Sequence, residues 1–206
     1  ILLEDIINEI GLEVENKKIL EIGAGSGLLS LLMAAKGAEV YVVDILPEAI
    51  KYMQILEKKL RDVLPAFYGS VNYIINGFNE MTKEEVPYNY FDIVHNAGVI
   101  EEYDLNTAGN IILQMKNCAR RGGIIIVGVP NFFNPYLIKI WLKHGKGNEI
   151  FYTKSRLKKV LLKSGNADIK IFISSYIFPF KKYTKLEHIL GRWGLGFLKI
   201  GIIKLS

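Results

Sequence analysis

Residues Ile19-Leu-Glu-Ile-Gly-Ala-Gly-Ser-Gly27 form a short apolar run that ends in a glycine-rich turn. The apolar stretch that follows, Leu28–Ala35, predicts a helix, so the segment predicts a strand, a tight turn and a helix. The three glycines let the backbone turn sharply and approach a ligand closely, because glycine has no Cβ. The N–H groups at the start of the helix face the turn, where they suit a carboxylate or a phosphate.

The next predicted strand, Glu39-Val-Tyr-Val-Val-Asp44, ends in a carboxylate. Asp44 lies 19 residues beyond Gly25, a spacing at which a carboxylate can accept hydrogen bonds from both hydroxyls of a ribose. The turn and this carboxylate together predict a site for an adenosine-containing cofactor. The alternative is a tight strand–helix turn without a ligand, which leaves the spaced Asp44 unexplained.

The residues around the turn distinguish between adenosine cofactors. A dinucleotide site has Gly-x-Gly-x-x-Gly, whose last glycine lets the helix pack close to the strand, but Leu28 stands at that place. Glu21, just before the turn, would repel a pyrophosphate and attract an ammonium group. The chain also holds no Tyr-x-x-x-Lys pair, the usual hydride-transfer relay of short-chain dehydrogenases. These features favour S-adenosylmethionine (SAM), which carries an ammonium, a carboxylate and a ribose.

Four segments carry a resemblance to the class I SAM-dependent methyltransferases: Glu21–Gly27, Val42–Asp44, Tyr90–Asn96 and Arg121–Val127. They follow the family's order and spacing and cover roughly residues 18–130. Within the family, the chain most resembles the small-molecule methyltransferases typified by the ubiquinone-biosynthesis O-methyltransferases. Those have Val-Leu-Glu-His after the fourth strand, and this chain has Val99-Ile-Glu-Glu102, so the family's His is replaced by Glu.

The alternation of short buried strands with helices predicts an α/β fold with a doubly wound parallel sheet. The resemblance makes this a Rossmann-like sheet of seven strands, mostly parallel with an antiparallel C-terminal strand, and helices on both faces. It implies one domain over residues 1–206, with a cofactor-binding core at 18–130, a substrate-covering insertion at 131–167 and a C-terminal strand hairpin at 168–206. The predicted strands are 18–22, 39–43, 71–75, 91–95, 124–129, 169–178 and 197–205, and the predicted helices are 1–10, 28–36, 47–60, 107–119, 135–143 and 155–164.

The resemblance also implies which residues bind SAM and its product S-adenosylhomocysteine. Backbone groups of the turn are expected at the methionine carboxylate and the ribose, and Glu21 at the ammonium. Asp44 is expected at the ribose hydroxyls, Ile45 and the backbone of Phe78 at the adenine, and Asn96 near the transferable methyl. The full set is Glu21, Gly23, Ala24, Gly25, Asp44, Ile45, Gly77, Phe78 and Asn96.

The candidate catalytic residues are Glu101 and Glu102, which follow the fourth strand together with Tyr103 and could reach a substrate hydroxyl or a bound metal. The alternative is that two adjacent acids stabilise the start of a helix. His95, inside the strand, is interpreted as a packed histidine. Adenine and amino-group methyltransferases have [Asp/Asn]-Pro-Pro-[Tyr/Phe] after this strand, and this chain has Asn96-Ala-Gly-Val99, so methylation of a nucleobase amino group is disfavoured. The resemblance to the O-methyltransferases implies methylation at oxygen. No His/Cys/Asp cluster has the spacing of metal ligands, so no metal site is predicted.

The charge of the chain is uneven. Residues 1–130 hold 11 Lys and Arg against 18 Asp and Glu, whereas residues 131–206 hold 15 against 3, a net charge of +12. This asymmetry predicts either an anionic partner, RNA or an anionic membrane surface, or a solvated basic face. One cysteine, Cys118, and the lack of a signal-like segment predict a cytoplasmic protein, with a peripheral membrane location as the alternative.

The leading hypothesis is therefore a SAM-dependent methyltransferase acting on a small molecule. Three alternatives remain: a SAM-dependent methyltransferase of RNA or of a membrane-associated anionic substrate, a nicotinamide-dependent oxidoreductase, and a family member that has lost activity.

Overall fold

The computed structural model describes residues 6, 11–64, 66–78, 80–145, 147–165, 168–175 and 190–205. The chain divides into two compact units, each described here by itself. The unit that contains the glycine turn comprises Glu13–Ala97, Leu113–Ile125 and Lys204–Ser206, and we call it the turn unit. The other, the hairpin unit, comprises Ile1–Leu12, Gly98–Ile112 and Ile126–Ile203.

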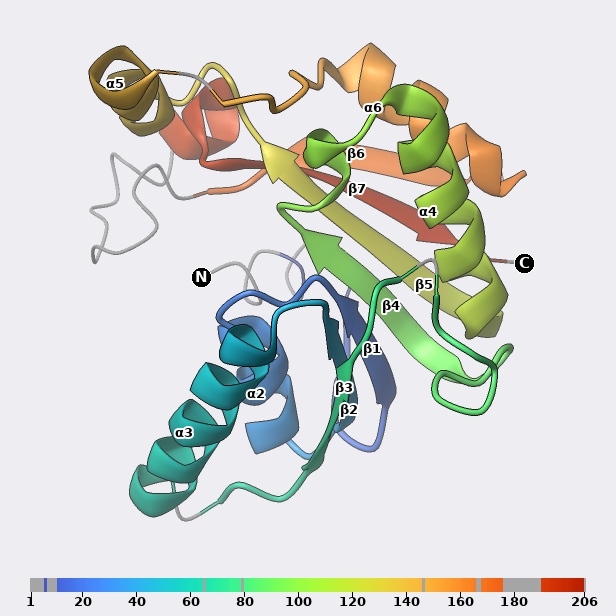
Figure 1. The fold of residues 1–206 in the computed structure, drawn as a ribbon. Helices are drawn as coiled ribbons and strands as arrows, with labels where there is room; N and C mark the ends of the chain where they lie inside the picture. Colours follow the sequence, from blue (N-terminus) through green and yellow to red (C-terminus); the bar gives the residue numbers. More distant parts are fainter. Residues whose placement is uncertain are drawn as a thin grey trace. The chain divides into compact units, whose positions relative to one another are not determined.

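The described residues form a seven-stranded mixed sheet with the strand order β3-β2-β1-β4-β5-β7-β6 (Figure 1). Strand β1 pairs in parallel with β2 and with β4, and β2 pairs in parallel with β3, whereas β6 and β7 are antiparallel. The predicted Rossmann-like methyltransferase fold is confirmed. The strands are β1 Lys18–Ile22, β2 Glu39–Asp44, β3 Ser70–Ile75, β4 Phe91–Ala97, β5 Ala119–Pro130, β6 Ile169–Ile173 and β7 Leu198–Lys204.

In the turn unit, helices α2 (Leu28–Ala35) and α3 (Pro47–Val63) lie side by side along strands β1 to β3 (Figure 1). Helix α2 is apolar on nearly every side and buries four of its eight residues. Helix α3 is amphipathic, with Ile50 and Met53 buried, and it begins at Pro47, whose fixed φ suits the first helical position. The apolar faces of both helices therefore close the core over this part of the sheet.

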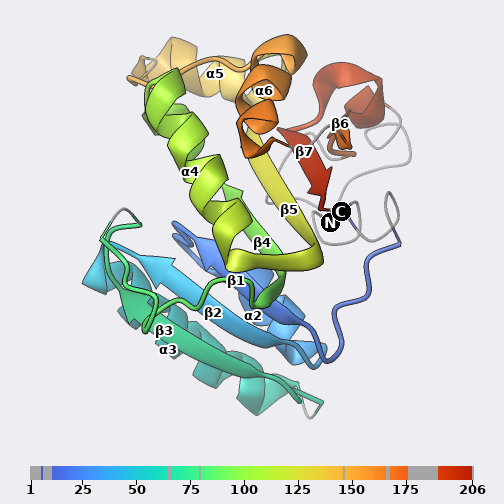
Figure 2. The same cartoon turned by 90° about the vertical axis from the view of Figure 1, so that its right-hand side faces the viewer.

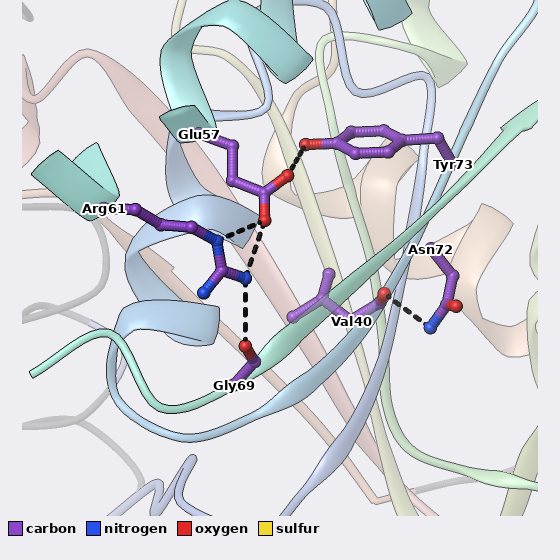
Figure 3. Close-up of polar contacts among 6 residues, drawn as sticks. All are labelled: Val40, Glu57, Arg61, Gly69, Asn72 and Tyr73. Carbon is purple, nitrogen blue, oxygen red and sulfur yellow. Dashed lines mark hydrogen bonds and ion pairs between the residues drawn. The ribbon is translucent and has the colours of Figure 1, made fainter. Parts of the chain in front are cut away.

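Polar contacts join α3 to β3 at the edge of the sheet (Figure 3). The hydroxyl of Tyr73 donates to Glu57 Oε2 at 2.8 Å, and Arg61 Nε donates to Glu57 Oε1 at 2.8 Å. Arg61 also donates to the carbonyl of Gly69 at 3.2 Å. The Tyr73 contact therefore ties α3 to its neighbouring strand, whereas the Arg61–Glu57 contact lies within the helix.

In the hairpin unit, the antiparallel pair β6–β7 packs beside helix α6 (Lys154–Leu161), which continues as a 3-10 turn through Ser164 (Figure 2). A Cβ at Gly201 of β7 would lie 2.4 Å from Leu161 Cδ1, so the absence of a side chain there lets helix and strand pack closely. Helix α5 (Pro135–His144) begins as predicted, because the Asn134 side chain accepts a hydrogen bond from Leu137 N at 3.0 Å.

Some predicted boundaries were wrong. Helix α4 (Leu105–Cys118) begins two residues early, because Asp104 Oδ1 accepts a hydrogen bond from Asn106 N at 2.8 Å and caps it. The segment Arg121–Gly123 lies within β5 and not in a turn before it, since Gly122 adopts a φ of +74° and lets the strand kink and continue. The predicted strand 169–178 ends at Ile173.

Two predicted segments lie outside the described residues: the helix over 1–10, except for the buried, helical Ile6, and residues 176–178. Among the described residues, no helix is both long enough and apolar enough to cross a membrane.

Candidate active site

The glycine turn joins β1 to α2 within the turn unit. Gly23, Gly25 and Gly27 all adopt the left-handed region, with φ of 65°, 53° and 60°. Gly23 N donates to Val43 O at 2.8 Å, and Gly27 N donates to Ala24 O at 2.8 Å. The turn is therefore tied to the neighbouring strand and closed on itself before the helix begins.

Two glycines of this turn give a matched pair of stability predictions. Gly27→Ala is expected to lower the free energy of unfolding by about 2–4 kcal/mol, for two reasons. Alanine is strained at this left-handed φ, and its Cβ would lie 2.0 Å from Met53 Sδ. Gly25→Ala has only the backbone strain, because its Cβ would meet nothing within 4 Å. It is expected to lower the free energy of unfolding by about 1–2 kcal/mol. Urea denaturation measures both. Equal losses would show that Met53 relaxes without cost.

Asp44 ties the turn to the loop that follows β2. Its side chain is buried, with Oδ2 accepting from Gly25 N at 2.9 Å and Oδ1 accepting from Leu46 N at 2.9 Å. A carboxylate has about four lone-pair positions. Two of them hold the backbone here, and the others suit donors such as hydroxyl groups.

Three buried polar side chains lie close together: Glu21 at the end of β1, Ser30 at the start of α2 and His95 in β4. His95 Nδ1 is 3.6 Å from Glu21 Oε1, and His95 Nε2 is 3.3 Å from Ser30 Oγ. Burial raises the pKa of Glu21 to about 7 and lowers the pKa of His95 to about 4. His95 is therefore a neutral, packed side chain, as interpreted from the sequence. Glu21 Oε2 is buried and has no hydrogen-bond partner among the described residues.

The ends of β2 and β3 present apolar side chains to solvent. Ile45 is 68% exposed and Leu46 57% exposed, and Ile75 is 54% exposed. Ile45 is therefore not a core residue, which leaves it free to cover a flat apolar group. Gly77 and Phe78 follow β3 and are partly exposed.

Asn96 lies near the end of β4 and is buried. Its Nδ2 contacts Met115 Sδ at 3.3 Å, while its Oδ1 has no partner among the described residues. A buried amide oxygen without a donor is costly, so this atom is suited to accept a hydrogen bond from a ligand.

In the hairpin unit, the two candidate catalytic acids lie in the 3-10 turn Ile100–Glu102 and differ in their exposure to solvent. Glu101 is buried, and its backbone carbonyl accepts from Ile150 N at 2.7 Å, whereas Glu102 is exposed. Burial, together with the nearby Glu102 and Glu149 carboxylates, raises the pKa of Glu101 to about 7. Glu101 can thus gain or lose a proton near neutral pH, which suits a general base.

The predicted cofactor residues all belong to the turn unit, and Glu101 and Glu102 belong to the hairpin unit. Sequence reasoning missed the contacts of His95 with Ser30 and with Glu21. Ser30 and His95 lie 65 residues apart, and no local pattern connects them. Among the residues that the structure describes, no group of three His, Cys, Asp or Glu could hold a metal ion.

A family model described as a methyltransferase domain matches residues 2–166. The crystal structure of magnesium protoporphyrin IX methyltransferase from Synechocystis, with bound S-adenosylhomocysteine, aligns with a TM-score of 0.65 and 17% identity over 100% of this chain and 81% of that one. This likeness shows the fold.

Two curated relatives match over short segments. A release factor glutamine methyltransferase of Dictyoglomus turgidum is 37% identical over 76 residues, which is 35% of this chain and 27% of that protein. A Methanocaldococcus jannaschii protein named for N5-glutamine methylation of proteins is 46% identical over 59 residues, 28% of this chain and 29% of that protein. The matches span less than a third of either relative.

Proposed function

The chain belongs to the methyltransferase-domain family, and from this premise we propose that it methylates an oxygen atom of a small molecule. It is a SAM-dependent methyltransferase, and SAM is its cofactor. When bound, SAM supplies a methyl group activated by a sulfonium, so the protein mainly has to align the acceptor with that methyl and exclude water. The nicotinamide-dependent oxidoreductase is left without support.

The single observation that carries the cofactor proposal is the environment of Glu21. Its Oε2 is a buried carboxylate oxygen beside the glycine turn and has no hydrogen-bond partner among the described residues. An ammonium group could donate a hydrogen bond to this oxygen, whereas a pyrophosphate would be repelled by its charge. The open space at Gly25 leaves room for the methionine end of SAM. The two remaining lone pairs of Asp44 suit the ribose hydroxyls, and the exposed Ile45 suits the adenine.

We expect Glu21→Gln to weaken SAM binding about tenfold while stabilising the SAM-free protein above pH 7. The folded pKa of Glu21 is raised from 4.5 to about 7, so the folded state binds the extra proton between these values. Stability of the wild type therefore falls as pH rises from 4.5 to 7, by at most about 3 kcal/mol for this group. Gln carries no charge, so the Glu21→Gln variant does not lose this stability as the pH rises.

Urea denaturation at pH 4.5 and pH 8, without SAM, measures the difference between wild type and Glu21→Gln. The control is Glu48→Gln, at an exposed residue of α3. If both substitutions changed the free energy of unfolding equally at pH 8, the charge of Glu21 would not be destabilised by burial.

The proposed preference for oxygen rests on the acids and on the residues after β4. A hydroxyl must lose its proton when it is methylated, and Glu101 has a pKa near 7 that suits a base. The chain lacks the Pro-Pro-aromatic segment that follows this strand in amino-group methyltransferases. The second candidate is methylation of a protein glutamine, because both curated relatives are named for that reaction.

We further propose that residues 131–167 cover the substrate and that residues 168–206 complete the same domain as a strand hairpin. The basic residues 131–206 remain a candidate docking face for RNA or an anionic membrane. The single cysteine is buried and fits a reducing cytoplasm.

The test is a methyl-transfer screen with radiolabelled SAM against phenols, hydroxy acids, a glutamine-containing peptide and RNA. We expect transfer to at least one small hydroxyl compound and none to the peptide or RNA. Transfer to the peptide alone would replace the oxygen proposal by the glutamine one. Binding of S-adenosylhomocysteine is measured alongside, so that a wrong acceptor is distinguished from a protein that does not bind the cofactor.

A further inference from the structure

Strand β7 carries a lysine in the interior of the hairpin unit. Lys199 is only 3% exposed, and its ammonium donates a hydrogen bond to the carbonyl of Tyr152. No carboxylate among the described residues forms an ion pair with it, and burial lowers the pKa of its ammonium. An ammonium has three donors, and burying its charge without an anionic partner is costly. Lys199 is therefore a buried cation with donor capacity to spare.

Lys199 lines a cavity of about 240 Å³ whose described walls contain no acidic residue. A second ammonium is close by, because Lys154 lines the same cavity, and its charge also lowers the pKa of Lys199. Thr153 and Lys154 form the start of helix α6, where backbone N–H groups favour a negative charge. The lining residues are Asn131, Phe133, Thr153, Lys154, Ile173, Gly194 and Lys199.

The polar wall of this cavity is held in place. Asn131 is fully buried, and its Nδ2 donates to Gly194 O and to Gly196 O, both at 2.8 Å. The remaining wall is apolar, with Phe133 and Ile173. A cavity that combines a fixed polar wall, an apolar wall and a buried cation has the general character of a small-molecule site.

We propose that this cavity binds the carboxylate of a small, partly apolar molecule. The ammonium groups of Lys199 and Lys154 hold the two carboxylate oxygens, and Phe133 and Ile173 contact the apolar body. Each of the two carboxylate oxygens can accept a hydrogen bond from one of the two ammonium groups. A phosphate dianion would leave further oxygens facing the apolar wall, so phosphate fits less well.

The experiment uses the whole chain without SAM and three probes: benzoate, benzamide as its neutral counterpart, and inorganic phosphate. Calorimetric titration measures affinity, and amide NMR shifts of Thr153 and Lys154 locate the bound probe. We expect benzoate to bind at least about tenfold more tightly than benzamide or phosphate, a difference of about 1.4 kcal/mol. Lys199→Met should lose at least about tenfold in benzoate affinity, and Lys158→Met, an exposed residue of α6, should lose none.

Equal affinity for benzoate and benzamide, tighter binding of phosphate, or no binding of benzoate would each overturn the proposal. So would an unchanged benzoate affinity in a folded Lys199→Met variant. If that variant does not fold, Lys154→Met at an exposed position replaces it, with an expected loss of about threefold or more. The inference stands apart from the proposed reaction, because every measurement is of binding without the cofactor.

Discussion

Asn in place of Asp44 is expected to weaken the binding of S-adenosylhomocysteine by at least about 100-fold, or about 2.7 kcal/mol. We propose that the carboxylate accepts hydrogen bonds from both ribose hydroxyls, and hydrogen bonds to a charged group contribute about 1.5–3 kcal/mol each. The carboxylate also accepts from Gly25 N and Leu46 N, so the amide of Asn would turn an N–H toward one of these donors. The substitution therefore removes ribose contacts and disturbs the turn.

Calorimetric titration with S-adenosylhomocysteine measures this loss, with NADH titrated alongside. Asp62→Asn is the matched control, because Asp62 is exposed on α3 and distant in sequence from the turn. Circular dichroism at the titration temperature confirms that Asp44→Asn is folded. A folded Asp44→Asn protein that binds within threefold of the wild type would remove Asp44 from the ribose site. Tighter binding of NADH would contradict the choice of cofactor.

Glu101→Gln is expected to lower kcat by about 100- to 10,000-fold on a hydroxyl acceptor, the usual contribution of a general base. Gln keeps the shape of the side chain but cannot take up the proton. The base is active when deprotonated, and burial raises the pKa of Glu101 from 4.5 to about 7. The kcat of the wild type should therefore rise with pH up to about 7 and then level off, whereas the residual activity of Glu101→Gln should not follow that rise.

The neighbouring acid provides the comparison. Glu102 is exposed, so we expect Glu102→Gln to lower kcat by less than about tenfold. Both variants should bind S-adenosylhomocysteine as the wild type does, because neither residue belongs to the predicted cofactor set. An equal loss in the two variants, or a wild-type profile that is flat between pH 5 and 8, would exclude Glu101 as the base.

The two acids also show where sequence reasoning stopped. Glu101 and Glu102 are adjacent and chemically alike, and the sequence alone offered no reason to prefer one of them. The structure buries Glu101 and leaves Glu102 exposed. The backbone contact from Ile150 to Glu101 comes from a segment 49 residues away, so a local pattern could not reveal it.

The amino-acid sequence by itself determined the strand, the glycine turn and the helix, because these depend on neighbouring residues. An apolar run, three glycines free to adopt positive φ, and a carboxylate 19 residues beyond Gly25 are local features, and they sufficed for the fold class and for the cofactor. Only the tertiary structure decided which charged groups lose contact with water. Glu21 comes to lie beside His95, and Lys199 in the interior of the hairpin unit, through contacts between distant segments. Their altered pKa values follow from that burial, because the energy of a charge depends on the solvent and the partners that the folded chain leaves to it.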